Sequence, residues 1–128
     1  MKTCLVVDDS RVIRMVARKI LQELGFNVAE AEDGQKALEY CRGHLPDVIL
    51  LDWNMPVMNG LDFMLAMRQL PGAGNVVIVF CTSINDLDSM VEAMQAGANE
   101  YVMKPFDSEI IRSKFEHLGL IESDGSEF

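Results

Sequence analysis

Charged and hydroxyl side chains follow four apolar segments of the chain, at the point where each segment ends. The side chains are those of Asp8, Asp9, Asp52, Thr82 and Lys104. The segments they follow are Cys4–Val7, Val48–Leu51, Val76–Cys81 and Tyr101–Met103. If these segments are strands of one parallel sheet, their carboxyl ends meet at a single edge, which is where open α/β sheets bind ligands. The sequence therefore predicts three carboxylates, a hydroxyl and an ammonium group at one edge.

Three carboxylates at one edge repel each other unless a hard cation neutralises them, and their oxygens suit Mg2+. We expect Asp9 and Asp52 to bind the ion directly and Asp8 to act through a metal-bound water. The backbone carbonyl of Asn54 is expected as a further ligand. A carboxylate such as that of Asp52 can act as a nucleophile and form an acyl phosphate. Because phosphoryl transfer depends mainly on positioning and charge neutralisation, this set predicts a phosphoryl-accepting site.

The remaining two polar residues fit the same chemistry. Lys104 is expected to pair with a phosphoryl oxygen as a point charge, and the Thr82 hydroxyl to donate a hydrogen bond to another. Taken singly, each residue has a simpler interpretation. An aspartate that ends a strand is usually a turn or cap residue, Asp8-Asp9-Ser10 also suits a helix N-terminus, and Lys104-Pro105 suits an ordinary loop. The agreement of four strand ends favours the joint site.

Five strand-like segments alternate with five helical ones, and these elements must position the site. Asn27–Ala31 is expected as a short second strand. Apolar residues spaced three and four apart predict the helices. Helix by helix, the expected apolar faces are Val12, Ile13, Val16, Ala17, Ile20, Leu21 and Leu24; Ala37, Leu38 and Cys41; Leu61, Met64, Leu65 and Met67; Leu87, Met90, Val91 and Met94; and Ile110, Ile111, Phe115 and Leu118. Right-handed crossovers then predict an α/β fold, a doubly wound five-stranded parallel sheet in the order 2-1-3-4-5.

Short polar residues and glycines mark the ends of the expected helices. Ser10, Asp33 and Asp107 can cap the first, second and fifth helices through their side-chain oxygens. Asn85-Asp86 is expected to lead into the fourth helix, and Gly25 to end the first.

The composition indicates a globular protein with a single core. The chain has 128 residues, 49% hydrophobic and 24% charged, with a formal net charge of −9. We expect one domain over residues 1–121 and a flexible acidic tail over 122–128. The negative charge argues against binding to nucleic acid or to an anionic membrane surface. No leader pattern and no apolar run of about 18 residues is present, so we expect a cytoplasmic protein without membrane insertion. Its three cysteines, at positions 4, 41 and 81, are expected as buried free thiols.

Five motifs carry a resemblance to a known family. They are Val7-Asp8-Asp9-Ser10, Leu51-Asp52-Trp53-Asn54-Met55-Pro56, Met58-Asn59-Gly60, Thr82-Ser83 and Tyr101-Val102-Met103-Lys104-Pro105-Phe106. In order and spacing, the chain resembles the receiver domain of bacterial two-component response regulators over Lys2–Leu120. The resemblance implies the flavodoxin-like, CheY-like version of the predicted fold.

The resemblance also implies roles for the residues at the sheet edge. Asp52 would be phosphorylated by a histidine kinase in a Mg2+-dependent reaction, with Lys104 as the phosphate sensor. Thr82 and Tyr101 would form a switch pair, which we expect to end neighbouring strands at the same edge. Thr82 would move toward the phosphoryl oxygens and Tyr101 would rotate into the space left. Such a protein is not an enzyme for other substrates: it accepts a phosphoryl group on its own aspartate and promotes its removal.

The closest subgroup is that of single-domain chemotaxis regulators of the CheY type. The run Asp52–Pro56 and a basic first helix (Arg11, Arg14, Arg18 and Lys19) resemble it. This subgroup implies a monomer that binds the flagellar motor switch through its fourth helix, fifth strand and fifth helix. Ile84 is a departure, because enteric chemotaxis proteins carry Glu there, and it leaves the phosphorylated lifetime and the help of a phosphatase open. A phosphate sink, a relay intermediate, or an adaptor in stress or developmental signalling remains as an alternative output.

Two functions outside this family fit the residues less well. An aspartyl-phosphate phosphatase of the haloacid dehalogenase class would need a general acid two residues after its nucleophile, where this chain has Asn54, which cannot protonate a leaving group. A flavodoxin-like cofactor binder would need a Ser-, Thr- and Gly-rich loop after the first strand. Asp8 and Asp9 stand there instead and would repel a phosphate.

Overall fold

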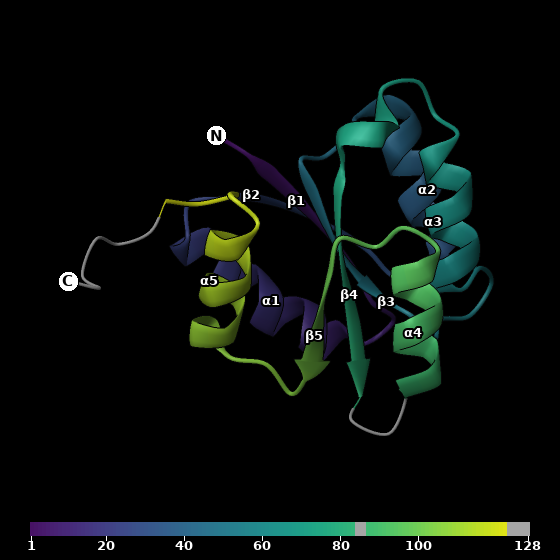
Figure 1. The fold of residues 1–128 in the computed structure, drawn as a ribbon. Coiled ribbons are helices and arrows are strands. Elements are labelled where there is room, and N and C mark those ends of the chain that lie inside the picture. The colour runs from purple at the N-terminus through teal and green to yellow at the C-terminus, as the bar shows by residue number, and fades with distance from the viewer. Residues whose placement is uncertain (84–86, 123–128) are drawn as a thin grey trace.

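Strands and helices alternate along the chain in the computed structural model, which describes residues 1–83 and 87–122 (Figure 1). The strands are β1 (Thr3–Val7), β2 (Asn27–Ala31), β3 (Val48–Asp52), β4 (Val77–Ser83) and β5 (Glu100–Lys104). The helices are α1 (Arg11–Glu23), α2 (Gly34–Gly43), α3 (Gly60–Arg68), α4 (Leu87–Gln95) and α5 (Ser108–His117), with a short 3-10 helix, η1 (Ala73–Asn75). The expected lead into α4 at Asn85-Asp86, the departure at Ile84, and residues 123–128 of the expected tail lie outside the described residues.

The five strands form one parallel sheet in the order β2-β1-β3-β4-β5, which confirms the predicted fold. The central strands are buried nearly throughout, as expected when helices cover both faces of a sheet. The register places Val7 opposite Leu51 and Asp52 opposite Cys81. The carboxyl ends of β1 and β3 therefore lie level with each other, and the residues that follow them share one edge.

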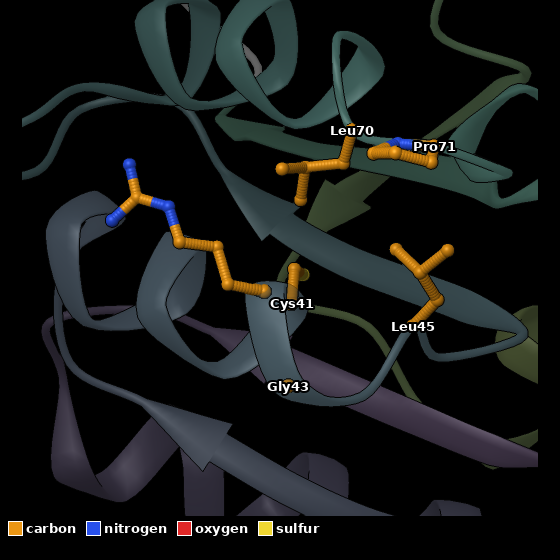
Figure 2. A pocket seen from close by; sticks show the side chains of 6 residues that line it. Cys41, Gly43, Leu45, Leu70 and Pro71 are labelled. Atoms are coloured by element: carbon orange, nitrogen blue, oxygen red, sulfur yellow. The ribbon is translucent and has the colours of Figure 1, made fainter.

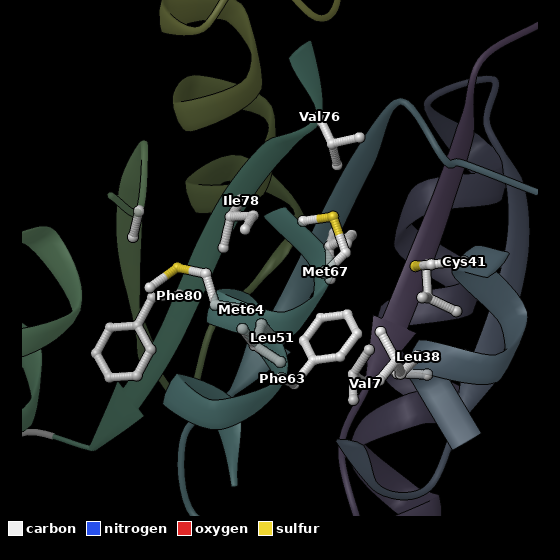
Figure 3. Packing of buried hydrophobic residues seen from close by; sticks show 14 of the residues in the cluster. Val7, Leu38, Cys41, Leu51, Phe63, Met64, Met67, Val76, Ile78 and Phe80 are labelled. Carbon is white, nitrogen blue, oxygen red and sulfur yellow. The ribbon is translucent and has the colours of Figure 1, made fainter. Parts of the chain in front are cut away.

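Two hydrophobic layers hold the sheet between its helices. Helices α2, α3 and α4 cover one face, and α1 and α5 cover the other (Figure 1). Figure 3 shows the first layer, where Phe63, Met64 and Met67 of α3 pack against Ile78 and Phe80 of β4. The second layer joins buried residues of α1 and α5 across β1, β3 and β4. The three cysteines are buried and free, as the sequence predicts.

Several apolar residues expected on the inner faces of helices are exposed instead, and that part of the prediction is wrong. They are Val12, Val16, Leu65, Leu87, Val91, Met94 and Ile110. On α1 the buried positions are Ala17, Ile20 and Leu21, while Val12 is 65% exposed and Val16 43%. Apolar spacing predicts a helix, but α1 and α4 are apolar on more than one face, and packing against the sheet covers only one of them.

The predicted helix starts are confirmed by their hydrogen bonds. The side chains of Ser10, Asp33 and Asp107 accept from the backbone N–H three residues later, at 3.3, 2.8 and 2.9 Å. Gly25 follows the end of α1 with a φ of +94°, which a residue with a Cβ rarely adopts. In the described ranges, no helix is long and apolar enough to cross a membrane.

Candidate functional site

The first part of the site lies where β1 ends. The Asp8 side chain is almost fully buried, with 3% of the residue exposed, whereas Asp9 is exposed. Asp8 Oδ1 accepts a hydrogen bond of 2.9 Å from the backbone N–H of Ser10. Arg14 of α1 donates to the backbone carbonyl of Asp8 at 2.6 Å and forms an ion pair with Glu30. The turn between β1 and α1 is thus fixed at its side chain and at its backbone.

The second part lies at the end of β3. Asp52 is the last residue of the strand, and its side chain is 12% exposed. The next residue, Trp53, turns into the core, where its ring meets that of Phe80 edge to face at 4.8 Å. Gly60 donates to the Trp53 carbonyl at 2.8 Å, and a Cβ at Gly60 would lie only 2.6 Å from the Asp52 carbonyl oxygen. Glycine is required there, because α3 begins directly against the strand that carries Asp52.

The predicted carboxylates and ammonium group converge. Carboxylate oxygens of Asp8, Asp9 and Asp52 all lie within 4.8 Å of one another. Lys104 Nζ, from the end of β5, lies 2.8 Å from Asp8 Oδ2 and 3.2 Å from Asp52 Oδ1. The peptide bond that follows, between Lys104 and Pro105, is cis. One ammonium group therefore bridges two carboxylates, while the third stands beside them toward solvent.

The electrostatics of this cluster show incomplete neutralisation. Burial raises the pKa of Asp52 to about 6, and the attraction of Lys104 only partly offsets this, while Asp8 and Asp9 add repulsion. Burial alone would lower the pKa of Lys104, but its bonds to Asp8 and Asp52 raise it above the ordinary value. Lys104 is thus fully charged, but its single positive charge does not balance the negative charges of three carboxylates. The arrangement favours an additional cation.

The donor set fits Mg2+ in chemistry. Carboxylate oxygens are the ligands this ion prefers, and it commonly uses only one or two of them together with waters. Asp9 and Asp52 present such oxygens at the open side of the cluster. Asn54 is exposed in the loop directly after β3, on the same edge.

The predicted switch residues lie near the site but not in the expected relation. Thr82, next to last in β4, is buried, and its hydroxyl donates to the Ser83 carbonyl at 3.2 Å. Tyr101 is the second residue of β5 and pairs with Phe80, whereas Thr82 pairs with Met103. Tyr101 therefore does not end its strand, contrary to our expectation. Because the two residues are diagonal neighbours on one face of the sheet, the space beside Thr82 is still adjacent to the tyrosine.

Sequence reasoning missed two contributors to the site. Arg14 was noted only as part of a basic helix, yet it holds the Asp8 carbonyl. Gly60 entered the sequence analysis only as part of the Met58-Asn59-Gly60 motif, yet it permits the close approach of α3 to β3. The sequence did contain a signal for the role of Gly60, because a glycine directly after a capping residue such as Asn59 suggests that a side chain would not fit there. Nothing in the sequence indicated that Arg14 would bind the Asp8 carbonyl.

An open pocket of about 410 Å³ lies apart from this cluster. It is bounded by the end of α2, around Cys41 and Arg42, and by Leu45, Leu70 and Pro71 in the loops that precede β3 and η1 (Figure 2). These loops lie toward the amino ends of β3 and β4, at the opposite end of the sheet from Asp52. The pocket does not contribute to the acidic site.

Most of the chain, and not only the sheet edge, matches known proteins. The sequence-family model for the response regulator receiver domain matches residues 4–116. The chain is 37% identical over 115 residues to a chemotaxis protein CheY of Pseudomonas aeruginosa, covering 89% of this chain and 93% of that one. It is 34% identical over 106 residues to the CheY of Bacillus subtilis, covering 82% and 87%. The structure of the chemotaxis response regulator CheY4 of Vibrio cholerae superposes with a TM-score of 0.86 at 33% identity, covering 92% and 98%. The chain belongs to the response regulator receiver domain family, and the relatives described above are named as CheY proteins.

Proposed function

We propose that this protein is a phosphorylation-driven switch in which Asp52 accepts a phosphoryl group from a histidine kinase. The observation that carries the proposal is the Lys104 ammonium bridging Asp8 and Asp52, with the Asp9 carboxylate in the same cluster. This arrangement supplies a nucleophile, a cation for the phosphoryl oxygens and a carboxylate set for a metal. Membership of the receiver family supports the same chemistry.

In the proposed reaction, Asp9, Asp52 and the Asn54 backbone carbonyl would hold Mg2+, with Asp8 acting through a bound water. When bound, the ion neutralises charge on the transferring phosphoryl oxygens. An Asp52 carboxylate oxygen attacks phosphorus as the bond from phosphorus to the donor histidine nitrogen breaks, and that nitrogen leaves with the bonding electron pair. With a pKa of about 6, Asp52 is largely ionised at neutral pH and can act as the nucleophile.

Lys104 and Thr82 would stabilise the phosphorylated state. Once Asp52 carries a phosphoryl group, Lys104 would move its ammonium group from the carboxylates to a phosphoryl oxygen. The Thr82 hydroxyl would donate to another oxygen, and Tyr101 would then occupy the space beside it. The added charge of about −1.5 to −2 drives these local changes. Water would later release phosphate from Asp52, so the chain acts on itself rather than on a separate substrate.

The proposed output is binding of the phosphorylated protein to a flagellar motor switch protein through α4, β5 and α5. Relatives named as chemotaxis proteins support this choice. The outer face of α4 also exposes Leu87 (53%), Val91 (51%) and Met94 (38%), which leaves an apolar stripe for a partner. A phosphate sink, a relay or an adaptor role would leave the same site intact but would not produce motor binding.

The phosphorylation step can be tested with a small donor. The full chain is incubated with acetyl phosphate in Mg2+ or in EDTA, and the modified residue is mapped by mass spectrometry. We expect modification at Asp52 in Mg2+ only, and its loss in Asp52→Asn but not in the exposed control Asp62→Asn. Modification of Asp52→Asn at the wild-type level would contradict the proposal.

The output can be tested by capture of a partner. Wild-type protein with and without beryllofluoride, a stable acyl-phosphate mimic, is mixed with a purified flagellar motor switch protein. We expect binding only with beryllofluoride, and loss of that gain in Thr82→Ala. Equal binding in both states would contradict the motor assignment and favour a sink, relay or adaptor role.

A further inference from the structure

The ring of Tyr101 is held from the opposite side of the sheet. Tyr101 packs against the hydrophobic layer that contains Phe80, on the face covered by α4. Lys114 belongs to α5, which covers the other face (Figure 1). Its ammonium nitrogen nevertheless lies 4.5 Å from the centroid of the Tyr101 ring. Because β5 is the edge strand, the lysine side chain can pass around the edge of the sheet and stack on the ring.

Glu100 fixes the position of this lysine. Glu100 Oε1 lies 3.5 Å from Lys114 Nζ and also accepts a 2.9 Å hydrogen bond from the backbone N–H of Tyr101. The carboxylate is therefore anchored to the strand itself. The side chains of Lys114 and Glu100 are 29% and 17% exposed, so solvent screens their attraction only in part. Strand, carboxylate, ammonium and ring form one closed set of contacts.

We propose that Lys114 is a positioning residue for Tyr101, and that with Glu100 it holds the ring in the place it takes while Asp52 carries no phosphoryl group. The inference rests on the proposed function, in which Tyr101 moves when Asp52 is phosphorylated. A contact made in only one of two conformations opposes the change to the other. The cation on α5 therefore sets how readily the switch responds, although it lies outside the phosphorylation site.

The expected effect of losing the lysine follows from the strength of such contacts. A cation stacked on an aromatic ring at a partly exposed position shifts an equilibrium by about two- to fivefold. In Lys114→Met the ring loses this restraint. By linkage, beryllofluoride should then bind in the presence of Mg2+ with an apparent affinity about two- to fivefold higher than in wild type.

The test combines a probe on the ring with a binding measurement on the full chain. The protein contains two tyrosines, Tyr40 and Tyr101, so incorporation of 3-fluorotyrosine gives two fluorine NMR resonances, assigned with Tyr40→Phe. In metal-free protein, Lys114→Met should shift the Tyr101 resonance and leave that of Tyr40 in place. Lys114→Arg should stay near wild type because a guanidinium also stacks on the ring. Arg112→Met, which removes an exposed cation from the same helix, is the matched control and should change neither resonance nor beryllofluoride affinity.

The outcomes separate this inference from the function on which it rests. A Tyr101 resonance that is the same in Lys114→Met and wild type overturns the positioning role. A shifted resonance with unchanged beryllofluoride affinity also overturns it, because the ring would then not be linked to the site. If the wild-type Tyr101 resonance fails to respond to beryllofluoride, the proposed switch itself fails and the inference with it. A wild-type response with an unaffected lysine variant removes the inference alone.

Discussion

At the amino end of the sheet, Arg68 donates hydrogen bonds to the carbonyls of Ala73, Val76 and Gly97 and to the side chain of Asn99, at 2.7 to 3.3 Å. At the carboxyl end, three carboxylates share the ammonium of Lys104. In the first region every acceptor is neutral: three are backbone carbonyls, and the fourth, the Asn99 amide oxygen, also accepts from the backbone N–H of Ile78. In the second, like charges are held together with too little positive charge. The first region stabilises the fold, whereas the second keeps the charge that the proposed function needs for a cation and a phosphoryl group.

The largest effect on stability is expected from a substitution at the amino end of the sheet. Arg68 links α3 to η1 and to the turn between α4 and β5, and removal of the guanidinium takes a charged donor away from the partly buried carbonyls of Ala73 and Val76. We expect Arg68→Met to lower the free energy of unfolding by about 2 to 3 kcal/mol. Urea unfolding measures this, with the exposed Arg42→Met as control. Phosphorylation by acetyl phosphate in Mg2+ should persist in the folded variant. A loss of that reaction with unchanged stability would mean that Arg68 serves the reaction and not the fold.

At the carboxyl end we expect a substitution to raise the free energy of unfolding and not to lower it. In metal-free protein, Asp52→Asn removes a buried like charge while Lys104 keeps its bond to Asp8. We expect the free energy of unfolding to rise by about 1 kcal/mol, although phosphorylation is lost. Glu39→Gln, an exposed charge removal on α2, should change stability little. Destabilisation by Asp52→Asn would mean that the carboxylate is a structural partner of Lys104.

Protonation of Asp52 at low pH should stabilise metal-free protein by an amount no larger than the Asp52→Asn substitution does. The folded-state pKa of Asp52 is raised from 3.8 to about 6, so between these values the folded protein binds more protons than the unfolded chain. The penalty of its charge is therefore present above pH 6 and disappears as pH falls toward 4. We expect metal-free wild type to gain about 1 kcal/mol relative to Asp52→Asn between pH 7.5 and pH 5, allowing for solvent screening. Parallel stability curves for the two proteins would exclude this account of the charge cluster.

The sequence predicted the acidic cluster well for a reason that lies in the fold. In a parallel sheet every strand delivers its last residue to the same edge, so Asp8, Asp52 and Lys104 could be brought together without knowledge of packing. Tyr101 shows the limit of this reasoning. An apolar segment does not reveal where its strand begins, and the pairing of Tyr101 with Phe80 places it two residues behind the pairing partner of Thr82.

Features that depend on which face a helix presents were equally out of reach. Val12, Met15 and Val16 are apolar at helical spacing, but they are exposed because later residues of α1, which are Ala17, Ile20 and Leu21, pack against the sheet instead. Contacts between a helix and a strand end or strand edge, such as Arg14 with the Asp8 carbonyl and Lys114 with the Tyr101 ring, join residues from elements whose relative tilt no local pattern encodes.

The central claim, that the carboxyl end lacks positive charge and binds Mg2+, is tested most directly by a Mg2+ titration followed through the fluorescence of Trp53, the one tryptophan of the chain, which adjoins Asp52. We predict a saturable change in the millimolar range for wild type and its loss in Asp9→Asn, whose fold should be intact because the Asp9 side chain is exposed. A fluorescence that does not respond to Mg2+, or that responds equally in Asp9→Asn, would contradict the account.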